Sequence, residues 1–191
     1  MAQARGIVKV GAMLRQLLLA VCLLALAMGS VRAEEARAPA LDAGLRERLA
    51  ALPHLYGGAL AADSLAGRVV VVTFFASLCP PCVTEFGHLG EVHAAYGDKG
   101  FEIVAVNLFE DFGGLSSPAK LAAFLERFAP QYPVVRGDDA VSHAFGGIDR
   151  IPTLFVFDRA GRPAFAFVHE QGATKTYVGA EELKDVIGAL L

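Results

Sequence analysis

The chain has 191 residues, of which 54% are hydrophobic, and its 17 basic and 20 acidic side chains give a net charge of −3 at pH 7. This length is enough for one domain with a substantial core. The acidic balance, without a basic cluster, argues against nucleic acid as a partner, because phosphate binding requires clustered lysine and arginine.

Residues 1–33 have the pattern of a secretory signal peptide. Three basic residues precede an apolar run over 17–28, and small residues follow it up to Ala33. The uncharged stretch 16–31 is short for a membrane span, which needs about 20 residues. We therefore predict cleavage after Ala33 and a periplasmic protein, with a retained inner-membrane anchor as the alternative. Cleavage removes four basic residues and Cys22, and leaves a net charge of −7.

Residues 34–56 are predicted to form a charged linker and a short helix. Leucines recur at helical spacing over 41–52, and Pro53 ends the pattern. Residues 55–67 place turn-forming residues around short apolar pieces, which indicates a small hairpin or an edge strand. The main domain is predicted to occupy residues 57–191.

Residues 69–75 are β-branched or aromatic, and only Thr73 among them is polar. A continuous apolar run of this length is typical of a strand covered on both faces, as in a parallel sheet. A helix is predicted to follow, with Cys79 at its N-cap. Pro80 and Pro81 then fall in the first turn, where a missing N–H costs no intrahelical hydrogen bond.

This placement predicts a reactive pair, Cys79 and Cys82. A helix N-terminus carries free N–H donors and partial positive charge, which stabilise a thiolate on Cys79. Because the two prolines supply no N–H, the amide of Cys82 is the first donor able to reach that sulfur. Cys82 lies almost one turn further in, so we predict Cys79 as the nucleophile and Cys82 as the resolving thiol. In a cleaved chain this pair is either a redox couple or half of a metal site.

The remaining pattern alternates between strands and helices. A strand over 101–108 completes a strand–helix–strand order, which predicts a right-handed unit with two parallel strands. The turn at 158–161 predicts an antiparallel hairpin between its flanking strands. The elements predicted after residue 108 are a polar loop (110–117), a helix (118–128), a strand (133–135), a short helix (139–145), two strands (153–157 and 163–168) and a closing helix (179–191).

Three stretches together resemble the TlpA/ResA-type exported thioredoxin-like proteins. They are Val72-Thr-Phe-Phe-Ala-Ser-Leu-Cys-Pro-Pro-Cys82, Gly100-Phe-Glu-Ile-Val-Ala-Val-Asn107 and Ile151-Pro-Thr-Leu-Phe-Val-Phe-Asp158. The resemblance covers roughly residues 57–191. It implies an α/β, thioredoxin-like fold, in which a central mixed sheet is flanked by helices and residues 118–135 form a helix–strand insertion.

The resemblance also implies roles for residues near the cysteines. It implies that Pro152 follows a cis peptide bond and faces the pair, so that the backbone of Ile151 is presented to an incoming peptide; the alternative is an ordinary trans proline at the start of an edge strand. It places a functional glutamate at Glu85, which could take the proton of Cys82 during resolution; the alternative is a solvated glutamate on the outer helix face. Three departures from the family pattern are Leu78, where tryptophan is common, Thr73, which replaces the buried aspartate of thioredoxin and cannot act as a base, and Gly87, where a helix proline is often seen.

The predicted function is a thiol–disulfide oxidoreductase that exchanges disulfides with protein clients and is recharged by an upstream electron-donor protein. The resemblance favours a reductant dedicated to cytochrome c maturation or to copper-site assembly. One alternative is a copper(I) carrier that uses both thiolates. A peroxiredoxin-like peroxidase is disfavoured, because its motif needs proline at position 72 and threonine or serine at position 76, where this chain has Val72 and Ala76.

No cofactor or metal is predicted. Glu110 and Asp111 lie in a glycine-bearing loop and are interpreted as solvated. The histidines lack the convergent spacing of metal ligands and are interpreted as surface or hydrogen-bonded residues. They are His54, His88, His93, His143 and His169.

Overall fold

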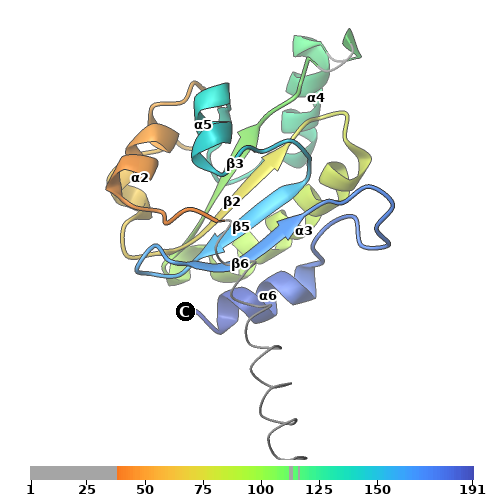
Figure 1. Ribbon diagram of the computed structural model, residues 1–191. Helices are drawn as coiled ribbons and strands as arrows, with labels where there is room; N and C mark the ends of the chain where they lie inside the picture. Colours follow the sequence, from red (N-terminus) through yellow and green to blue (C-terminus); the bar gives the residue numbers. More distant parts are fainter. Residues whose placement is uncertain (1–37, 112–113, 116) are drawn as a thin grey trace, which may run out of the picture. The chain divides into compact units, whose positions relative to one another are not determined.

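The computed structural model describes residues 38–111, 114–115 and 117–191, and its elements are labelled in Figure 1. The predicted signal segment, residues 1–33, lies outside the described residues. The strands are β1 (His54–Tyr56), β2 (Val69–Phe75), β3 (Phe101–Asn107), β4 (Val134–Arg136), β5 (Thr153–Phe157) and β6 (Pro163–Val168). The helices are α2 (Ala43–Ala50), α3 (Pro80–Tyr96), α4 (Pro118–Phe128), α5 (Asp139–Ala144) and α6 (Ala180–Gly188), with 3₁₀ turns η1 (Ala62–Leu65) and η2 (Gly97–Lys99).

The strands form one mixed sheet in the order β1-β4-β3-β2-β5-β6. β2 lies in its interior, parallel to β3 and antiparallel to β5, and all seven of its residues are buried. The prediction that this apolar run forms a strand covered on both faces is therefore confirmed. The predicted mixed sheet flanked by helices is confirmed.

Helices cover both faces of the sheet (Figure 1). One face packs against α3, α4 and α6, through side chains such as Phe86, Phe124 and Ile187. The other face packs against α2 and α5, through side chains such as Leu49 and Phe145. Because side chains alternate along a strand, Thr73 lies on the same face of β2 as Val71 and Phe75, the face that packs against α3. A polar side chain is thereby placed beneath α3.

The segment 55–67 does not form a hairpin. Its first residues belong to β1, which pairs with β4 at the edge of the sheet, so the edge-strand alternative is the correct one. Gly57 then turns the chain with a φ of 76°, and a side chain there would overlap the carbonyl of Tyr132. The rest of the segment contains the 3₁₀ turn η1.

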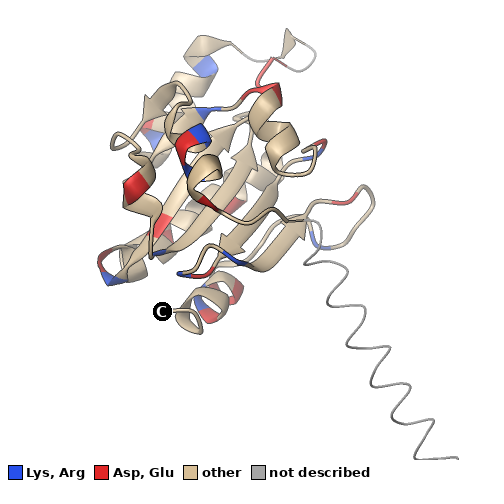
Figure 2. Cartoon of the chain, turned by 60° about the vertical axis from the view of Figure 1, so that its left-hand side comes forward, with Lys and Arg blue, Asp and Glu red and all other residues tan. Residues whose placement is uncertain are grey.

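Lysine, arginine, aspartate and glutamate are interspersed along the helices and loops of the described chain (Figure 2). In this view, the ribbon segments that carry lysine and arginine are separated from one another rather than gathered in one place. Among residues 38–111, 114–115 and 117–191, no helix has the length and apolarity needed to span a bilayer.

Candidate active site

Cys79 and Cys82 are joined by a disulfide at the N-terminus of α3, with their Cα atoms 5.2 Å apart. Cys79 is the N-cap, and the amide of Cys82 donates to its Sγ at 3.3 Å, as predicted from the two prolines. The two sulfurs differ in access, because Cys79 is half-buried whereas Cys82 is only 1% exposed. Only Cys79 is therefore open to attack from outside.

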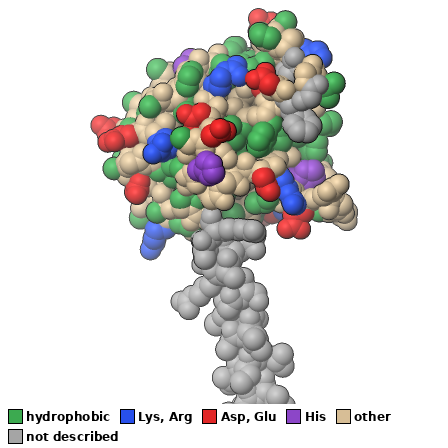
Figure 3. Space-filling view, turned by 45° about the horizontal axis from the view of Figure 1, so that its top comes forward, with side chains coloured by type: hydrophobic (Ala, Val, Ile, Leu, Met, Phe, Trp, Pro, Cys, Tyr) green, Lys and Arg blue, Asp and Glu red, His purple; other side chains and the backbone are tan. Residues whose placement is uncertain are grey.

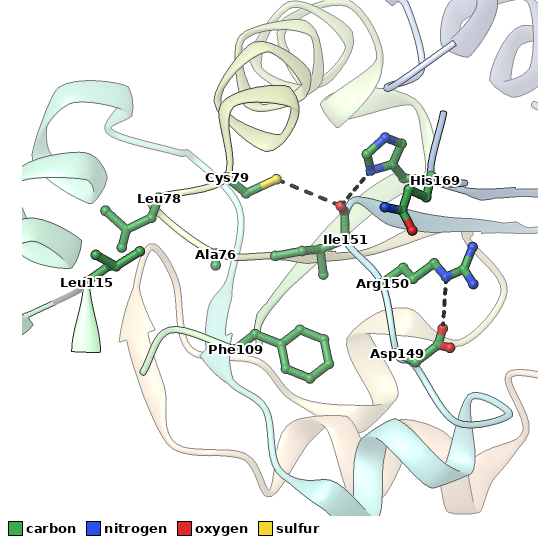
Figure 4. A pocket seen from close by; sticks show the side chains of 10 residues that line it. Ala76, Leu78, Cys79, Phe109, Leu115, Asp149, Arg150, Ile151 and His169 are labelled. Carbon is green, nitrogen blue, oxygen red and sulfur yellow. Dashed lines mark hydrogen bonds and ion pairs between the residues drawn. The ribbon is translucent and has the colours of Figure 1, made fainter. Parts of the chain in front are cut away.

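The cis Ile151–Pro152 bond faces this sulfur from the start of β5. The predicted cis geometry is confirmed. The carbonyl oxygen of Ile151 lies 3.9 Å from Cys79 Sγ, and the same oxygen lies 3.1 Å from Nδ1 of His169 (Figure 4). A carbonyl oxygen only accepts hydrogen bonds, so Nδ1 of His169 must carry the proton.

A groove of about 720 Å³ opens beside Cys79. Leu78 and Leu115 lie at one end of the view in Figure 4, and Arg150 and His169 at the other. Leu78, Phe109 and Leu115 are 38%, 41% and 65% exposed, and they are the large hydrophobic side chains that the described residues expose. Figure 3 shows hydrophobic side chains spread over the surface of one face among charged side chains. An apolar groove beside a reactive sulfur is the arrangement expected of a binding site for a substrate segment.

Glu85 lies one turn beyond Cys82 on the inner face of α3 and is 1% exposed. The alternative of a solvated glutamate is therefore wrong. The hydroxyl of Thr73 donates to one carboxylate oxygen at 2.9 Å, and the amide of Val178 donates to the other at 3.2 Å. Nδ1 of His88, one turn further along α3, donates to the carbonyl of Val178 at 3.1 Å. The main-chain amide and carbonyl groups of Val178 thus hold the segment before α6 against α3.

Burial raises the pKa of Glu85 from 4.5 to about 7. The hydrogen bonds from Thr73 and Val178, and then the charge of Lys175, act in the opposite direction and are weaker. A carboxyl group with this pKa can both accept and release a proton near neutral pH, which suits it to acid–base work.

The prediction that Glu110 is solvated is wrong, because the residue is only 7% exposed. Its carboxylate accepts hydrogen bonds from the amide of Ser77 at 2.9 Å and from the side-chain amide of Asn107 at 2.7 Å. The Ser77 hydroxyl donates to the same carboxylate. Glu110 therefore ties the loop that precedes Cys79 to the end of β3.

Phe109, the residue before Glu110, has a left-handed backbone with a φ of 58°. Non-glycine residues adopt this region rarely and at some cost. Here the Phe109 side chain is exposed in the groove while Glu110 is buried beneath the Cys79 loop. One strained residue separates the buried carboxylate from the exposed ring.

Replacing Glu110 by alanine should lower the free energy of unfolding by about 2–4 kcal/mol, because the half-buried donors of Ser77 and the buried side-chain amide of Asn107 lose this acceptor. Asp111 is the matched control, being an exposed carboxylate next in the chain. Asp111→Ala should change stability by less than about 0.5 kcal/mol. Urea unfolding of the oxidised proteins measures both values, and equal effects would show that Glu110 does not hold the loop.

The structure brings together the predicted residues Cys79, Cys82, Ile151 and Pro152, and it places Glu85 behind Cys82. Sequence reasoning did not find the contributions of Glu110, His169 and Val178. Glu110 lies three residues after Asn107, and this spacing at the end of a predicted strand was the one available signal. Among the described residues, no group of three or more His, Cys, Asp or Glu side chains is arranged to hold a metal ion.

A mixed six-stranded sheet, a disulfide at the N-terminus of a helix and a cis proline opposite it define a thiol–disulfide oxidoreductase with a thioredoxin-like fold. The model of the Redoxin family matches residues 34–183, and the chain belongs to this family. The fold expected from the resemblance is confirmed by a solved structure, a thiol:disulfide interchange protein of the thioredoxin family from Chlorobium tepidum. It superposes with a TM-score of 0.58 at 22% identity and covers 73% of this chain and 94% of its own.

Two relatives named thiol-disulfide oxidoreductase ResA support the same class. The chain is 29% identical over 138 residues to that of Halalkalibacterium halodurans, covering 71% of this chain and 72% of the relative. It is 32% identical over 97 residues to that of Geobacillus thermodenitrificans, covering 50% of this chain and 52% of the relative. The second alignment thus spans about half the length of the relative it matches.

Proposed function

We propose that this protein reduces disulfides in protein clients outside the cytoplasm, with Cys79 as nucleophile and Cys82 as resolving thiol. The observation that carries the proposal is the difference in access between the two sulfurs. Cys79 is half-buried and lines an apolar groove, whereas Cys82 is enclosed by the protein. A client sulfur can therefore join Cys79, and Cys82 can be reached only from within.

In the first step, the thiolate of Cys79 attacks one sulfur of a client disulfide. The client S–S bond breaks, a Cys79–client disulfide forms, and the other client sulfur leaves as a thiolate that takes a proton from water. Stabilisation of the attacking thiolate comes from the helix N-terminus and from the amide of Cys82, which already points at Cys79 Sγ.

In the second step, the thiolate of Cys82 attacks Cys79 Sγ, which forms the intramolecular disulfide and releases the second client sulfur as a thiolate. Two electrons thereby pass from the dithiol to the client. Glu85 is the group proposed to take the proton from Cys82, since it lies one turn away and its pKa is raised to about 7 by burial. An upstream electron-donor protein then reduces the Cys79–Cys82 disulfide by the reverse sequence.

The groove beside Cys79 is the proposed docking site for the residues that flank a client cysteine. Leu78, in the position where the resembling family often has tryptophan, forms part of its apolar rim. Ile151, which precedes the cis bond, lines the groove with Asp149 and Arg150, and its main chain is the part proposed to contact an extended client.

Export is proposed from residues 1–33, acting as a cleaved signal peptide or as an inner-membrane anchor. A periplasmic reductant dedicated to cytochrome c maturation or copper-site assembly is the role that the ResA resemblance favours. Residues 34–56 are proposed as the linker and helix that precede the catalytic domain.

The test uses the reduced protein and an oxidised peptide that carries a Cys-x-x-Cys-His haem-attachment sequence, which is the client chemistry of cytochrome c maturation. We expect the peptide disulfide to be reduced faster than by glutathione at equal thiol concentration, with stoichiometric formation of the Cys79–Cys82 disulfide. A peptide with the same composition but separated cysteines is the control for specificity.

A rate no faster than that of glutathione with every peptide would contradict the proposal. Copper(I) affinity is measured on the same reduced protein by competition with a chelator. Tight copper(I) binding combined with slow disulfide exchange would replace the oxidoreductase proposal with a carrier.

A further inference from the structure

We propose that His169 is a positioning residue for Cys79: by holding the carbonyl of Ile151 it stabilises the thiolate form of the nucleophile. The inference rests on the proposed role of Cys79 and goes beyond it, because it assigns a function to a residue outside the cysteine motif. The observation behind the inference is that a single carbonyl oxygen, that of Ile151, lies close to both residues. The Ile151 carbonyl faces both Cys79 Sγ and the His169 ring (Figure 4).

The Ile151 oxygen is unfavourable for a thiolate. A carbonyl oxygen carries partial negative charge, so at 3.9 Å it repels an ionised sulfur and instead accepts a hydrogen bond from a protonated thiol. Both effects favour the less reactive thiol form of Cys79. A donor bound to the same oxygen offsets this effect, and Nδ1 of His169 is such a donor at 3.1 Å.

The Cys79 loop leaves few other ways to stabilise the thiolate. Pro80 and Pro81 have no N–H, so of the three residues after Cys79 only Cys82 can donate a main-chain hydrogen bond to Sγ. Stabilisation of the Cys79 thiolate through the Ile151 carbonyl and His169 therefore matters more in this chain than it would if the residues between the cysteines had N–H groups.

The position of His169 is set by the sheet. β5 and β6 are antiparallel, with Thr153 paired to Val168, and the amide of His169 continues this pairing by donating to the carbonyl of Pro152 at 3.0 Å. The ring is thereby brought to the carbonyl of the preceding residue, Ile151. Because the main chain at His169 is already held by the sheet, only the side-chain torsions have to be ordered when the ring makes its hydrogen bond.

The charged side chains around His169 are Asp149 and Arg150, which pair with each other at 3.9 Å, and Glu170, its exposed neighbour in the chain. Lys175 lies over the rings of Phe165 and Phe167, and neither β5 nor β6 carries a charged residue.

Two substitutions separate the hydrogen bond from the ring that makes it. His169→Leu removes both, whereas His169→Gln keeps an N–H donor for the Ile151 carbonyl and removes the ring. His143→Gln is the control, since His143 is an exposed histidine on α5 that does not line the groove. Thermal unfolding of each oxidised protein checks that the fold is retained.

The measurement is the rate of iodoacetamide alkylation of the reduced protein from pH 5 to 9, with the alkylated cysteine identified by peptide mapping. We expect His169→Leu to raise the pKa of the Cys79 thiol by about one unit, so that alkylation at pH 6 falls about tenfold, because removing a nearby favourable group shifts a pKa on this scale. His169→Gln should give a smaller shift in the same direction, and His143→Gln none.

The inference would be overturned if His169→Leu changed the pKa of the Cys79 thiol by less than about 0.2 units. This holds even if the variant unfolds at a lower temperature, because a residue with a purely structural role would affect stability and leave the pKa unchanged. In that case Cys79 would remain the residue alkylated first and the proposed function would stand. Faster alkylation of Cys82 than of Cys79 in the unaltered protein would overturn both.

Discussion

Replacing Cys79 by serine should abolish disulfide exchange with clients, whereas replacing Cys82 should leave the first step intact and stop the second. A serine hydroxyl does not ionise near neutral pH, so Cys79→Ser should lower the rate of peptide-disulfide reduction on the order of a thousandfold. Cys82→Ser instead should accumulate a disulfide between Cys79 and the client. Non-reducing electrophoresis and mass spectrometry of the product measure this difference.

The comparison is made in a chain in which Cys22 is also replaced by serine, because a third thiol could resolve the mixed disulfide. The physical basis of the asymmetry is the burial of Cys82, which is 1% exposed. Trapping of clients by both single variants to the same extent would show that both sulfurs are accessible, and the assignment of nucleophile and resolving thiol would be withdrawn.

Replacing Glu85 by glutamine should make the protein more stable at alkaline pH. The pKa of this carboxyl group is ordinarily 4.5 and is raised to about 7 in the folded protein, so between these values the folded state binds one more proton than the unfolded state. The stability that protonated Glu85 contributes is therefore fully present below about pH 4.5 and is lost as the pH rises through about 7. The loss amounts to about 3 kcal/mol, and Glu85→Gln should not show it.

Glutamine fits the site because the Thr73 hydroxyl can turn to accept its NH₂ group while its carbonyl accepts from Val178. Urea unfolding of the oxidised proteins at pH 4.5 and 8 measures the difference. Glu91→Gln is the control, as Glu91 is an exposed carboxylate on the same helix. A pH dependence unchanged in Glu85→Gln would show that Glu85 does not titrate between these values.

The same variant should slow the resolution of a mixed disulfide at pH 7. A positioned general base typically contributes about a hundredfold or more to a proton-transfer step, and glutamine cannot accept the proton of Cys82. Rapid-quench measurement of the loss of the Cys79–client disulfide gives the rate. A rate equal to that of Glu91→Gln would remove Glu85 from the mechanism while leaving its effect on stability in place.

The elements around the cysteines were predictable because their determinants are local. The apolar run at 69–75 and the prolines after Cys79 specify a buried strand and a helix start within a few residues of each other. The observed bounds of β2, Val69–Phe75, and the N-cap position of Cys79 agree with that prediction. The segment 55–67 was ambiguous for the opposite reason, since its pairing partner is β4, far along the chain.

The two buried carboxylates show where sequence reasoning ended. Glu85 and Glu110 are both buried, and one donor of each comes from a distant residue, Val178 or Ser77, which are 93 and 33 residues away in the chain. Burial depends on which distant segments pack over a residue, and no local pattern carries that information. The interpretation of Glu110 as solvated failed for this reason.

By itself, the sequence determined the reactive pair, its place at a helix N-terminus and the order of strands and helices around it, because each follows from spacing and backbone chemistry over a few residues. Only the tertiary structure decided how deeply Cys82 is buried, that Glu85 and Glu110 are both enclosed, and which histidine reaches the Ile151 carbonyl. Those properties arise from desolvation and from hydrogen bonds between segments that meet only when the sheet has formed.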